Sequence, residues 1–242
     1  MAMPRFFVDE PQAPNRQVFL ESGDARHAMQ VLRLGLHDRI IIVSAGAAWE
    51  AEITQVARGA VTARILSERI EGAAELPVAI TVLQAIVKGT KFDEVVEKAV
   101  ELGAGAIIPV ACERSYASVG PNQLARWRRI ARAAAAQSRR RLVPLVGEPI
   151  TWTAAMADAK LRPCIVAYEG ASAGSLASAL KRLEPKQFLA VAVGPEGSFT
   201  KAELAAADGA GCVRAWLGPT ILRTESAAAA MIAAVACRMG WW

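Results

Sequence analysis

The sequence predicts an α/β protein in which a short, mostly β N-terminal region precedes a parallel sheet covered by helices. After Pro77, short apolar runs alternate with longer amphipathic segments, which is the pattern of a parallel sheet with helices on its faces. Before Pro77, apolar segments are separated by glycine turns, which is typical of antiparallel strands. Hydrophobic residues make up 53% of the 242 residues and charged residues 21%, so the chain can bury a core.

The N-terminal region is expected to contain three clear strands and a short helix. Strands are predicted over 39–43, 49–56 and 60–66, because turns at Ala45-Gly46 and Arg58-Gly59 separate them. A helix is predicted over 24–34, with Ala28, Val31 and Leu32 on its buried face. The stretch from Glu71 to Pro77 is interpreted as a linker.

The rest of the chain is expected to alternate strands with helices. Predicted strands cover 78–83, 106–110, 164–168, 188–193 and 213–217, and predicted helices cover 91–102, 122–139, 175–183, 200–208 and a last segment from about Thr224. In the first helix, apolar residues recur at helical spacing, Thr90 can cap the start and Gly103 can end it. Thr200 and Glu203 form the pattern of a capping box.

Positive charge is concentrated in one interval. No acidic residue lies between Glu113 and Glu148, and this interval holds Arg114, Arg126, Arg128, Arg129, Arg132, Arg139, Arg140 and Arg141. Arginine suits bidentate phosphate binding, so the run indicates a partner that is a nucleic acid or another polyanion. The alternative is a solvated basic helix.

Several classes of protein and site are disfavoured. The longest apolar stretch near the end, 226–237, is shorter than the roughly 20 residues of a membrane span, and the first residues lack the apolar core of a signal peptide. The four cysteines are scattered and expected to be buried free thiols of a cytoplasmic protein, with no metal site. Walker, dinucleotide-binding and serine-hydrolase motifs are absent.

Two loops that follow predicted strands carry the functional signal. The first is Gly194-Pro195-Glu196-Gly197-Ser198-Phe199, where two glycines allow a ligand to approach the backbone. The second, 217–226, exposes apolar Ile221 and Leu222 and then brings Arg223 and Glu225 around Thr224, a candidate helix cap. Arg223 and Glu225 could instead pair as a local ion bridge. Parallel strands bind ligands at their carboxyl ends, so both loops are candidate site elements.

These segments resemble the bacterial 16S rRNA (uracil-N3) methyltransferases of the SPOUT superfamily. The resemblance rests on GPEGSF with Glu203, LGPTILRTESA, KFDEVVEKAVELG with Pro109, and the opening MPRFFVD with His27 and VLRLG; Gln137-Ser138 with Arg140 and Pro144 adds to it. It implies a PUA-like β-barrel over 1–72 and a SPOUT methyltransferase domain with a deep trefoil knot over 73–242. It further implies a homodimer that binds S-adenosyl-L-methionine and acts on 16S rRNA of the small ribosomal subunit.

The resemblance also assigns residues. It implies cofactor contacts from Tyr168, Glu169, Gly194, Pro195, Glu196, Gly197, Leu217, Gly218, Ile221, Leu222 and Thr224. Methylation of uridine N3 needs a proton acceptor and a cation near the uracil oxygens. Arg223 is the expected cation and Glu196 or Glu225 the expected acceptor, with the alternative that either carboxylate instead orients Arg223. Expected phosphate contacts come from Arg5, Arg33, Arg126, Arg129, Arg139, Arg140 and Arg141.

Three departures and three rival functions accompany this interpretation. Thr220 replaces the usual basic residue, Ala136 replaces a glutamate, and His37 replaces a glycine before Asp38, which affects details of substrate contact. The rivals are a SPOUT enzyme with another RNA target, a non-enzymatic ribosome-assembly protein, and a Rossmann-type methyltransferase. The last would place its glycine loop after the first strand of the sheet, which this chain does not do.

Overall fold

The computed structural model describes residues 3–20, 22–57, 59–72, 75–115, 119–170, 173–183 and 187–241. Contacts divide the chain into two compact units: Met1–Glu75 with Ala135–Val143, and Leu76–Ala134 with Pro144–Trp242. The domain ranges 1–72 and 73–242 stay a prediction, and Ala73 and Arg58 lie outside the described residues.

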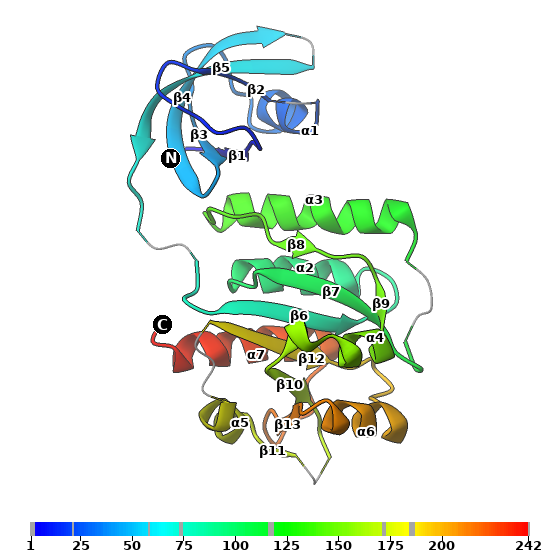
Figure 1. Cartoon of the computed structure of the whole chain (residues 1–242). Coiled ribbons are helices and arrows are strands. Elements are labelled where there is room, and N and C mark those ends of the chain that lie inside the picture. The colour runs from blue at the N-terminus through cyan, green and yellow to red at the C-terminus, as the bar shows by residue number, and fades with distance from the viewer. Residues whose placement is uncertain are drawn as a thin grey trace. The chain divides into compact units, whose positions relative to one another are not determined.

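The first unit is a small curled sheet of five strands (Figure 1). Its strand order is β1-β3-β4-β5-β2, formed by β1 Arg5–Phe7, β3 Arg39–Ser44, β4 Ala47–Ala57, β5 Ala60–Arg69 and β2 Gln17–Leu20. Only the β1–β3 pair is parallel among these described strands. The three strands expected from the sequence are confirmed with longer ends, whereas β1 and β2, only three and four residues long, were not predicted.

The predicted helix over 24–34 is shorter and buries a different face. It consists of α1 Ser22–Arg26 and a π-helical turn, η1 His27–Val31. Ala25 and Ala28 are buried, but Val31 and Leu32 are exposed, so the predicted buried face was wrong at these two positions. The wider π turn shifts the register at which side chains point to the sheet, and a period of 3.6 residues fails there.

Ion pairs connect the expected linker to arginines of the first unit. Arg5 forms a bidentate pair with Glu71 at 2.6–2.7 Å and also donates to the carbonyl oxygens of Arg139 and Arg140. Arg140, 3% exposed, pairs with Glu75, which also accepts from the backbone N–H of Arg141. A buried guanidinium needs such partners, so both acids stabilise this unit.

The second unit contains an eight-stranded parallel sheet. Along the sheet the order is β11-β13-β10-β12-β6-β7-β8, and β9 pairs with β7. The strands are β6 Ala79–Ala85, β7 Ala106–Ala111, β8 Leu145–Val146, β9 Ile150–Thr151, β10 Cys164–Ala167, β11 Gly174–Ser175, β12 Phe188–Val193 and β13 Val213–Trp216. All five predicted strands are present, and the three two-residue strands are additions.

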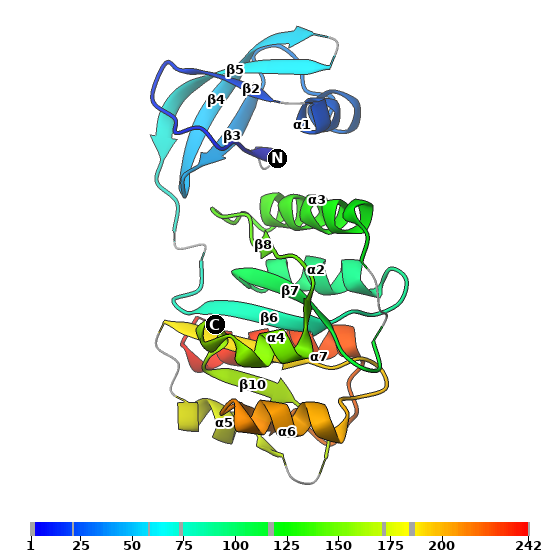
Figure 2. The same ribbon diagram turned by 45° about the vertical axis from the view of Figure 1, so that its right-hand side comes forward.

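Helices cover both faces of this sheet, as the alternating pattern predicted. They are α2 Lys91–Glu101, α3 Pro121–Gln137, α4 Trp152–Ala157, the short 3₁₀ helix η2 Ala159–Leu161, α5 Leu176–Leu183, α6 Lys201–Gly209 and α7 Thr224–Arg238. One face carries α2 and α7, which pack together, and the other carries α4 and α6 (Figure 2). The chain therefore returns from β13 near the sheet edge to place α7 over the central strands β12 and β6. The trefoil knot stays a prediction.

Helix ends and cysteines give one confirmation and two corrections. Gly103 has φ +99° at the end of α2, so its predicted role as a helix stop is confirmed. Thr90 makes no side-chain capping bond, because its backbone is already helical and its carbonyl oxygen accepts from Asp93 and Glu94. Cys112, Cys164 and Cys212 are buried, but Cys237 is exposed.

Two absences hold for the described part of the chain. No helix there is long and apolar enough to cross a membrane. No cluster of three or more histidine, cysteine or acidic side chains there is arranged to hold a metal ion.

Gly103→Ala tests the end of α2. A Cβ at this position would lie 2.7 Å from Leu76 Cγ and Cδ1, and φ is +99°. We expect the free energy of unfolding to fall by about 1–3 kcal/mol in urea titrations, because strain and overpacking act together. Gly105→Ala is the matched control, since its Cβ would be at ordinary contact distance, 3.7 Å from the Ile80 carbonyl oxygen. Equal losses in both variants would contradict this explanation.

Candidate active site

The candidate site lies where the central strands of the parallel sheet end. Strands β13, β10, β12 and β6 are consecutive neighbours in the sheet, so their carboxyl ends meet at one edge. The loops that follow begin at Leu217, Tyr168, Gly194 and Ile86. The structure therefore brings both loops predicted from the sequence to one edge, together with the end of β6.

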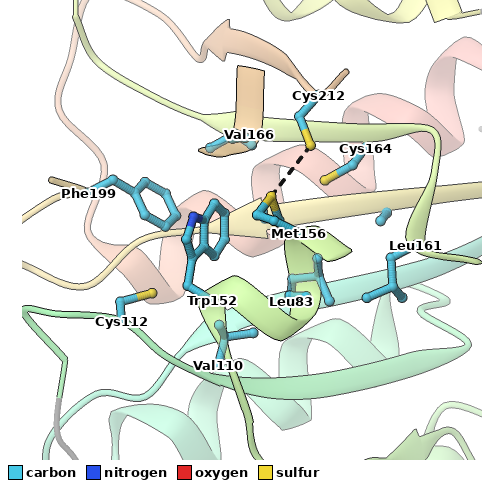
Figure 3. Packing of buried hydrophobic residues seen from close by; sticks show 14 of the residues in the cluster. Leu83, Val110, Cys112, Trp152, Met156, Leu161, Cys164, Val166, Phe199 and Cys212 are labelled. Atoms are coloured by element: carbon cyan, nitrogen blue, oxygen red, sulfur yellow. Dashed lines mark hydrogen bonds between the residues drawn. The ribbon is translucent and has the colours of Figure 1, made fainter. Parts of the chain in front are cut away.

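The loop after β12 is held in place by a buried aromatic side chain, Phe199. Phe199 is buried and packs against Trp152, with ring centroids 4.5 Å apart (Figure 3). A Cβ on Gly194 would lie 3.0 Å from the Phe199 ring, so glycine lets the strand end pass over it. The predicted capping box of Thr200 and Glu203 is confirmed and starts α6 directly after Phe199. The exposed part of the loop, Glu196 and Gly197, thus stands on a packed base.

A chain of hydrogen bonds joins three distant segments at this edge. Gln84 Nε2, in β6, donates to Thr224 Oγ1 at 2.8 Å, and the Thr224 hydroxyl donates to the Gly194 carbonyl oxygen at 2.8 Å. Thr224 was expected to cap the last helix, but this expectation was wrong. Arg223 occupies the N-cap position without a side-chain capping bond, and Thr224 is the first helical residue. Its hydroxyl holds the strand end instead.

Charged side chains from α2, the loop after β12 and the start of α7 lie near these hydrogen bonds. Lys91 Nζ lies 2.7 Å from Glu196 Oε1. The hydrogen bond from Lys91 is the largest cause that lowers the pKa of Glu196, and the bond to Glu196 is the largest cause that raises the pKa of Lys91. Glu225 also raises the pKa of Lys91 and Arg223 lowers it, so both lie within electrostatic range. Of the three expected catalytic residues, Glu196 is bound to Lys91, and Glu225 and Arg223 act on it electrostatically.

Two buried oxygen atoms at this edge have no hydrogen-bond partner among the described residues. They are Gln84 Oε1 and Glu225 Oε2. Gln84 is 0% exposed, so leaving its Oε1 without a hydrogen-bond donor lowers the free energy of unfolding. Unpaired buried acceptors of this kind are typical of a site that a ligand completes.

The loop after β13 presents apolar surface. Ile221 is 87% exposed, while Leu217 and Leu222 are half-buried. Gly218 has φ +133°, a conformation that other residues rarely adopt. Among the ion pairs of the described residues there is none between Arg223 and Glu225, so the local bridge considered as an alternative is not formed.

The end of β10 contributes less. The backbone N–H of Tyr168 donates to the Ala215 carbonyl oxygen, and the Arg214 guanidinium lies 5.7 Å from the Tyr168 ring centroid. Glu169 is exposed. Tyr168 is therefore tied to β13, the strand that leads into the loop with Ile221.

The expected phosphate-binding arginines divide into two groups. Arg5 and Arg140 are buried and ion-paired, Arg126 pairs with Asp93 at 2.7 Å, and Arg141 donates to the carbonyl oxygens of Glu71 and Gly72. Arg33, Arg129 and Arg139 are exposed, and no ion pair of the described residues involves them. The acid-free interval is thus partly neutralised by acids from other segments. Arg5 and Arg140 hold the fold rather than face phosphates.

Comparison with known proteins identifies the family. An RNA methyltransferase domain matches residues 74–236, and an RNA methyltransferase PUA domain matches residues 20–66. The chain is 32% identical to ribosomal RNA small subunit methyltransferase E of Bacillus subtilis over 241 residues, covering 93% of each protein. The chain belongs to the small-subunit ribosomal RNA methyltransferase E family. The resemblance noted from the sequence is confirmed.

Solved structures of this family share the fold. The methyltransferase E structure from Neisseria gonorrhoeae, bound to S-adenosyl methionine, has a TM-score of 0.89 and 33% identity and covers 98% of both chains. A Legionella pneumophila methyltransferase structure with bound cofactor SAM has a TM-score of 0.91 and 25% identity, again over 98% of both chains. The expected SPOUT-type sheet and PUA-like region are thereby confirmed.

Sequence reasoning missed two residues of this site. Gln84 is a buried polar residue within an apolar strand, and this interruption was the available signal. Lys91 opens the KFDEVVEKAVELG segment that carries the family resemblance, but nothing in that segment marks it as the partner of Glu196. Only the pairing of β12 with β6 brings it to Glu196.

Thr224→Val tests the hydrogen-bond chain. Valine keeps the shape of threonine but leaves the Gly194 carbonyl oxygen without its donor and Gln84 Nε2 without its acceptor at Thr224. We expect a loss of about 1–3 kcal/mol in the free energy of unfolding, measured in urea. Thr224→Ser keeps the hydroxyl and is expected to retain most of that stability. A valine variant as stable as the wild type, or a serine variant that loses as much stability as the valine variant, would contradict the special role of the hydroxyl.

Proposed function

We propose that this protein transfers the methyl group of S-adenosyl-L-methionine to N3 of a uridine in 16S rRNA. The observation that carries the proposal is the meeting of the GPEG loop, the LGPTILRTE loop and Lys91 at one edge of the sheet, within a chain of this family. Relatives that bear the methyltransferase E name, and the relative solved with S-adenosyl methionine, support both substrate and methyl donor.

The residues at the sheet edge fit this methyl donor. Exposed Ile221 and half-buried Leu222 offer apolar surface to an adenine ring, and nothing lies within 4 Å of the place where a Cβ on Gly218 would stand. The unpaired acceptor Gln84 Oε1 suits a donor group of a ligand. We assign to the cofactor the loops around Tyr168 and Glu169, Gly194–Gly197 and Leu217–Leu222, with Thr224 as the residue that joins them. When bound, this group supplies a methyl on a positively charged sulfur.

The chain's own side chains supply what the uridine needs. N3 of uracil is an imide N–H that is barely nucleophilic until it loses its proton, so a carboxylate must accept that proton. Glu196 and Glu225 are the carboxylates at the site, and Arg223 is the cation assigned to the uracil oxygens as negative charge develops. All three lie within electrostatic or hydrogen-bond range of Lys91.

RNA binding is assigned to exposed arginines of both units. Arg33 and Arg139 belong to the first unit and Arg129 to the second, and all three side chains are exposed. Contacts to phosphate position an RNA without specifying its sequence. We retain Arg126 and Arg141 as weaker candidates, because each already has a protein partner.

The wider setting belongs to the same proposal. The family relationship supports a PUA-like RNA-binding domain over 1–72, a knotted catalytic domain over 73–242, a homodimer and a cytoplasmic location. The target is 16S rRNA within the small ribosomal subunit.

Methyl transfer to small subunits tests the function. Subunits from a strain that lacks this protein are incubated with labelled S-adenosyl-L-methionine, and their nucleosides are analysed by mass spectrometry. We expect 3-methyluridine as the labelled product. Another methylated nucleoside would indicate another RNA target. Intact RNA binding without cofactor binding would indicate a ribosome-assembly protein.

Arg129→Ala tests the RNA surface. Removing one phosphate contact is expected to reduce the salt dependence of RNA binding, with the slope of log K against log salt falling by about 1. Arg128→Ala, one residue away on α3, is the control, because Arg128 already binds the Val146 carbonyl oxygen and Glu148. Equal changes in the two variants would contradict the assignment of Arg129.

A further inference from the structure

The two carboxylates of the proposed site have different surroundings. Glu196 is bound to Lys91, whereas Glu225 lies in the first turn of α7, the helix that packs against α2, and forms no ion pair with Lys91 among the described residues. We propose that Lys91 is a positioning residue that holds Glu196, and that Glu225 is the catalytic residue that accepts the N3 proton. This inference rests on the proposed function and divides the labour among its residues.

The contact between Lys91 and Glu196 joins elements that are far apart in sequence. Lys91 is the first residue of α2, Glu196 lies in the loop after β12, and 105 positions separate them. The 2.7 Å contact is partly shielded, with 40% and 43% of the two side chains exposed. Because α2 follows β6 and β6 pairs with β12, the sheet itself holds this contact in place.

Holding Glu196 in this pair makes it a poor proton acceptor. One of its oxygens already accepts the Lys91 hydrogen bond, and the pKa of Glu196 is lowered, chiefly by that bond. A lower pKa reduces the tendency of a carboxylate to take a proton from a weak acid such as an imide. The pKa of Lys91 is raised by the same bond, so the amine stays protonated and cannot serve as the acceptor.

Glu225 has the vacant oxygen that the reaction needs. Its Oε2 is buried and has no hydrogen-bond partner among the described residues, so no donor there occupies the lone pair that would accept the proton. Glu225 lies in the first turn of α7 and follows Thr224, whose hydroxyl donates to the Gly194 carbonyl oxygen. The helix start is therefore fixed beside the loop that carries Glu196.

Arg223 and Lys91 have complementary parts in this arrangement. Arg223 lies two residues before Glu225, and a guanidinium carries N–H donors and no acceptor, so it can stabilise developing negative charge but cannot accept a proton. Lys91 is the second cation, and its charge is balanced by Glu196. The proton moves from N3 of the uridine to Glu225, and the N3 electron pair forms the bond to the methyl group. The electron pair of the broken methyl–sulfur bond stays on the sulfur, so the donor leaves as a neutral thioether.

A substrate with a more acidic N3–H can distinguish the residue that accepts the proton from residues that only position other groups. Small subunits from the deletion strain grown with 5-fluorouracil carry 5-fluorouridine, whose N3–H loses its proton more easily. A variant without the acceptor gains more from this substitution than the wild type does. The readout is the ratio of the methylation rate on fluorinated subunits to the rate on natural subunits.

Four single variants and one double variant give distinct expectations. Glu225→Gln is expected to lose about 100-fold or more in kcat on natural subunits, the typical contribution of a general base, and to raise the rate ratio at least about tenfold. Glu196→Gln and Lys91→Met are expected to lower kcat without changing the ratio. Lys91→Arg should restore part of the activity, and Lys91→Met should add little to Glu196→Gln in the double variant, because Lys91 acts through Glu196.

Two outcomes would overturn the inference. A raised ratio in Glu196→Gln would make Glu196 the acceptor, and an unchanged ratio in a Glu225→Gln protein that still binds S-adenosyl-L-methionine would remove Glu225 from that role. If Glu225→Gln no longer binds the cofactor, the rate ratio of Glu196→Gln decides. An unchanged rate ratio in that variant supports the inference, and a raised rate ratio overturns it. Absence of 3-methyluridine from the wild-type reaction would instead reject the proposed function.

Discussion

The parallel pairing of β12 with β6 is the constraint on which the site depends. Six consecutive residues are in register, from Phe188 opposite Ala79 to Val193 opposite Gln84. This register ends both strands at the same level and brings Gln84 beside the start of the GPEG loop. The hydrogen bonds through Thr224 and the contact of Lys91 with Glu196 follow from it. A shift of one residue would turn Gln84 to the other face of the sheet and remove the hydrogen bond to Thr224.

Rigid packing beneath the loops turns this register into a defined site. Phe199 is buried against Trp152 directly below Gly194, and the capping box at Thr200 fixes the next helix. On the other face, α7 packs against α2, so the segments that carry Glu225 and Lys91 are held together. Sites supported in this way keep their geometry without help from a ligand. The unpaired oxygens of Gln84 and Glu225 are then the part of the site that the protein leaves open.

Much of the fold could be predicted because its signals are local. Apolar runs located the five long strands of the second unit, and helical periodicity located α2. The short strands β1, β2, β8, β9 and β11 have too few residues to show a pattern, and the π turn after α1 broke the periodicity that predicted a buried Val31. Local sequence also could not reveal that Glu71 and Glu75 neutralise Arg5 and Arg140.

The sequence predicted the individual loops of the site but not the contacts between them. Glycines and the acids beside them indicated both loops, but the partner of Glu196 is Lys91, 105 positions away, and only the strand order connects them. The assignment of Thr224 as a cap failed for the same reason, since its hydroxyl bonds to Gly194, 30 positions away. Charge along the sequence likewise overstated the free positive surface of α3, because Asp93 and Glu148 come from other elements.

A crystal structure of the protein with S-adenosyl-L-homocysteine would show which residues form the site. We expect the ligand to contact Gly194–Gly197 and Leu217–Leu222, Lys91 to stay bound to Glu196, and Glu225 Oε2 to face the space beside the ligand sulfur. A ligand bound away from the ends of β12 and β13, or a Lys91 side chain that leaves Glu196 to bind the ligand, would contradict this expectation.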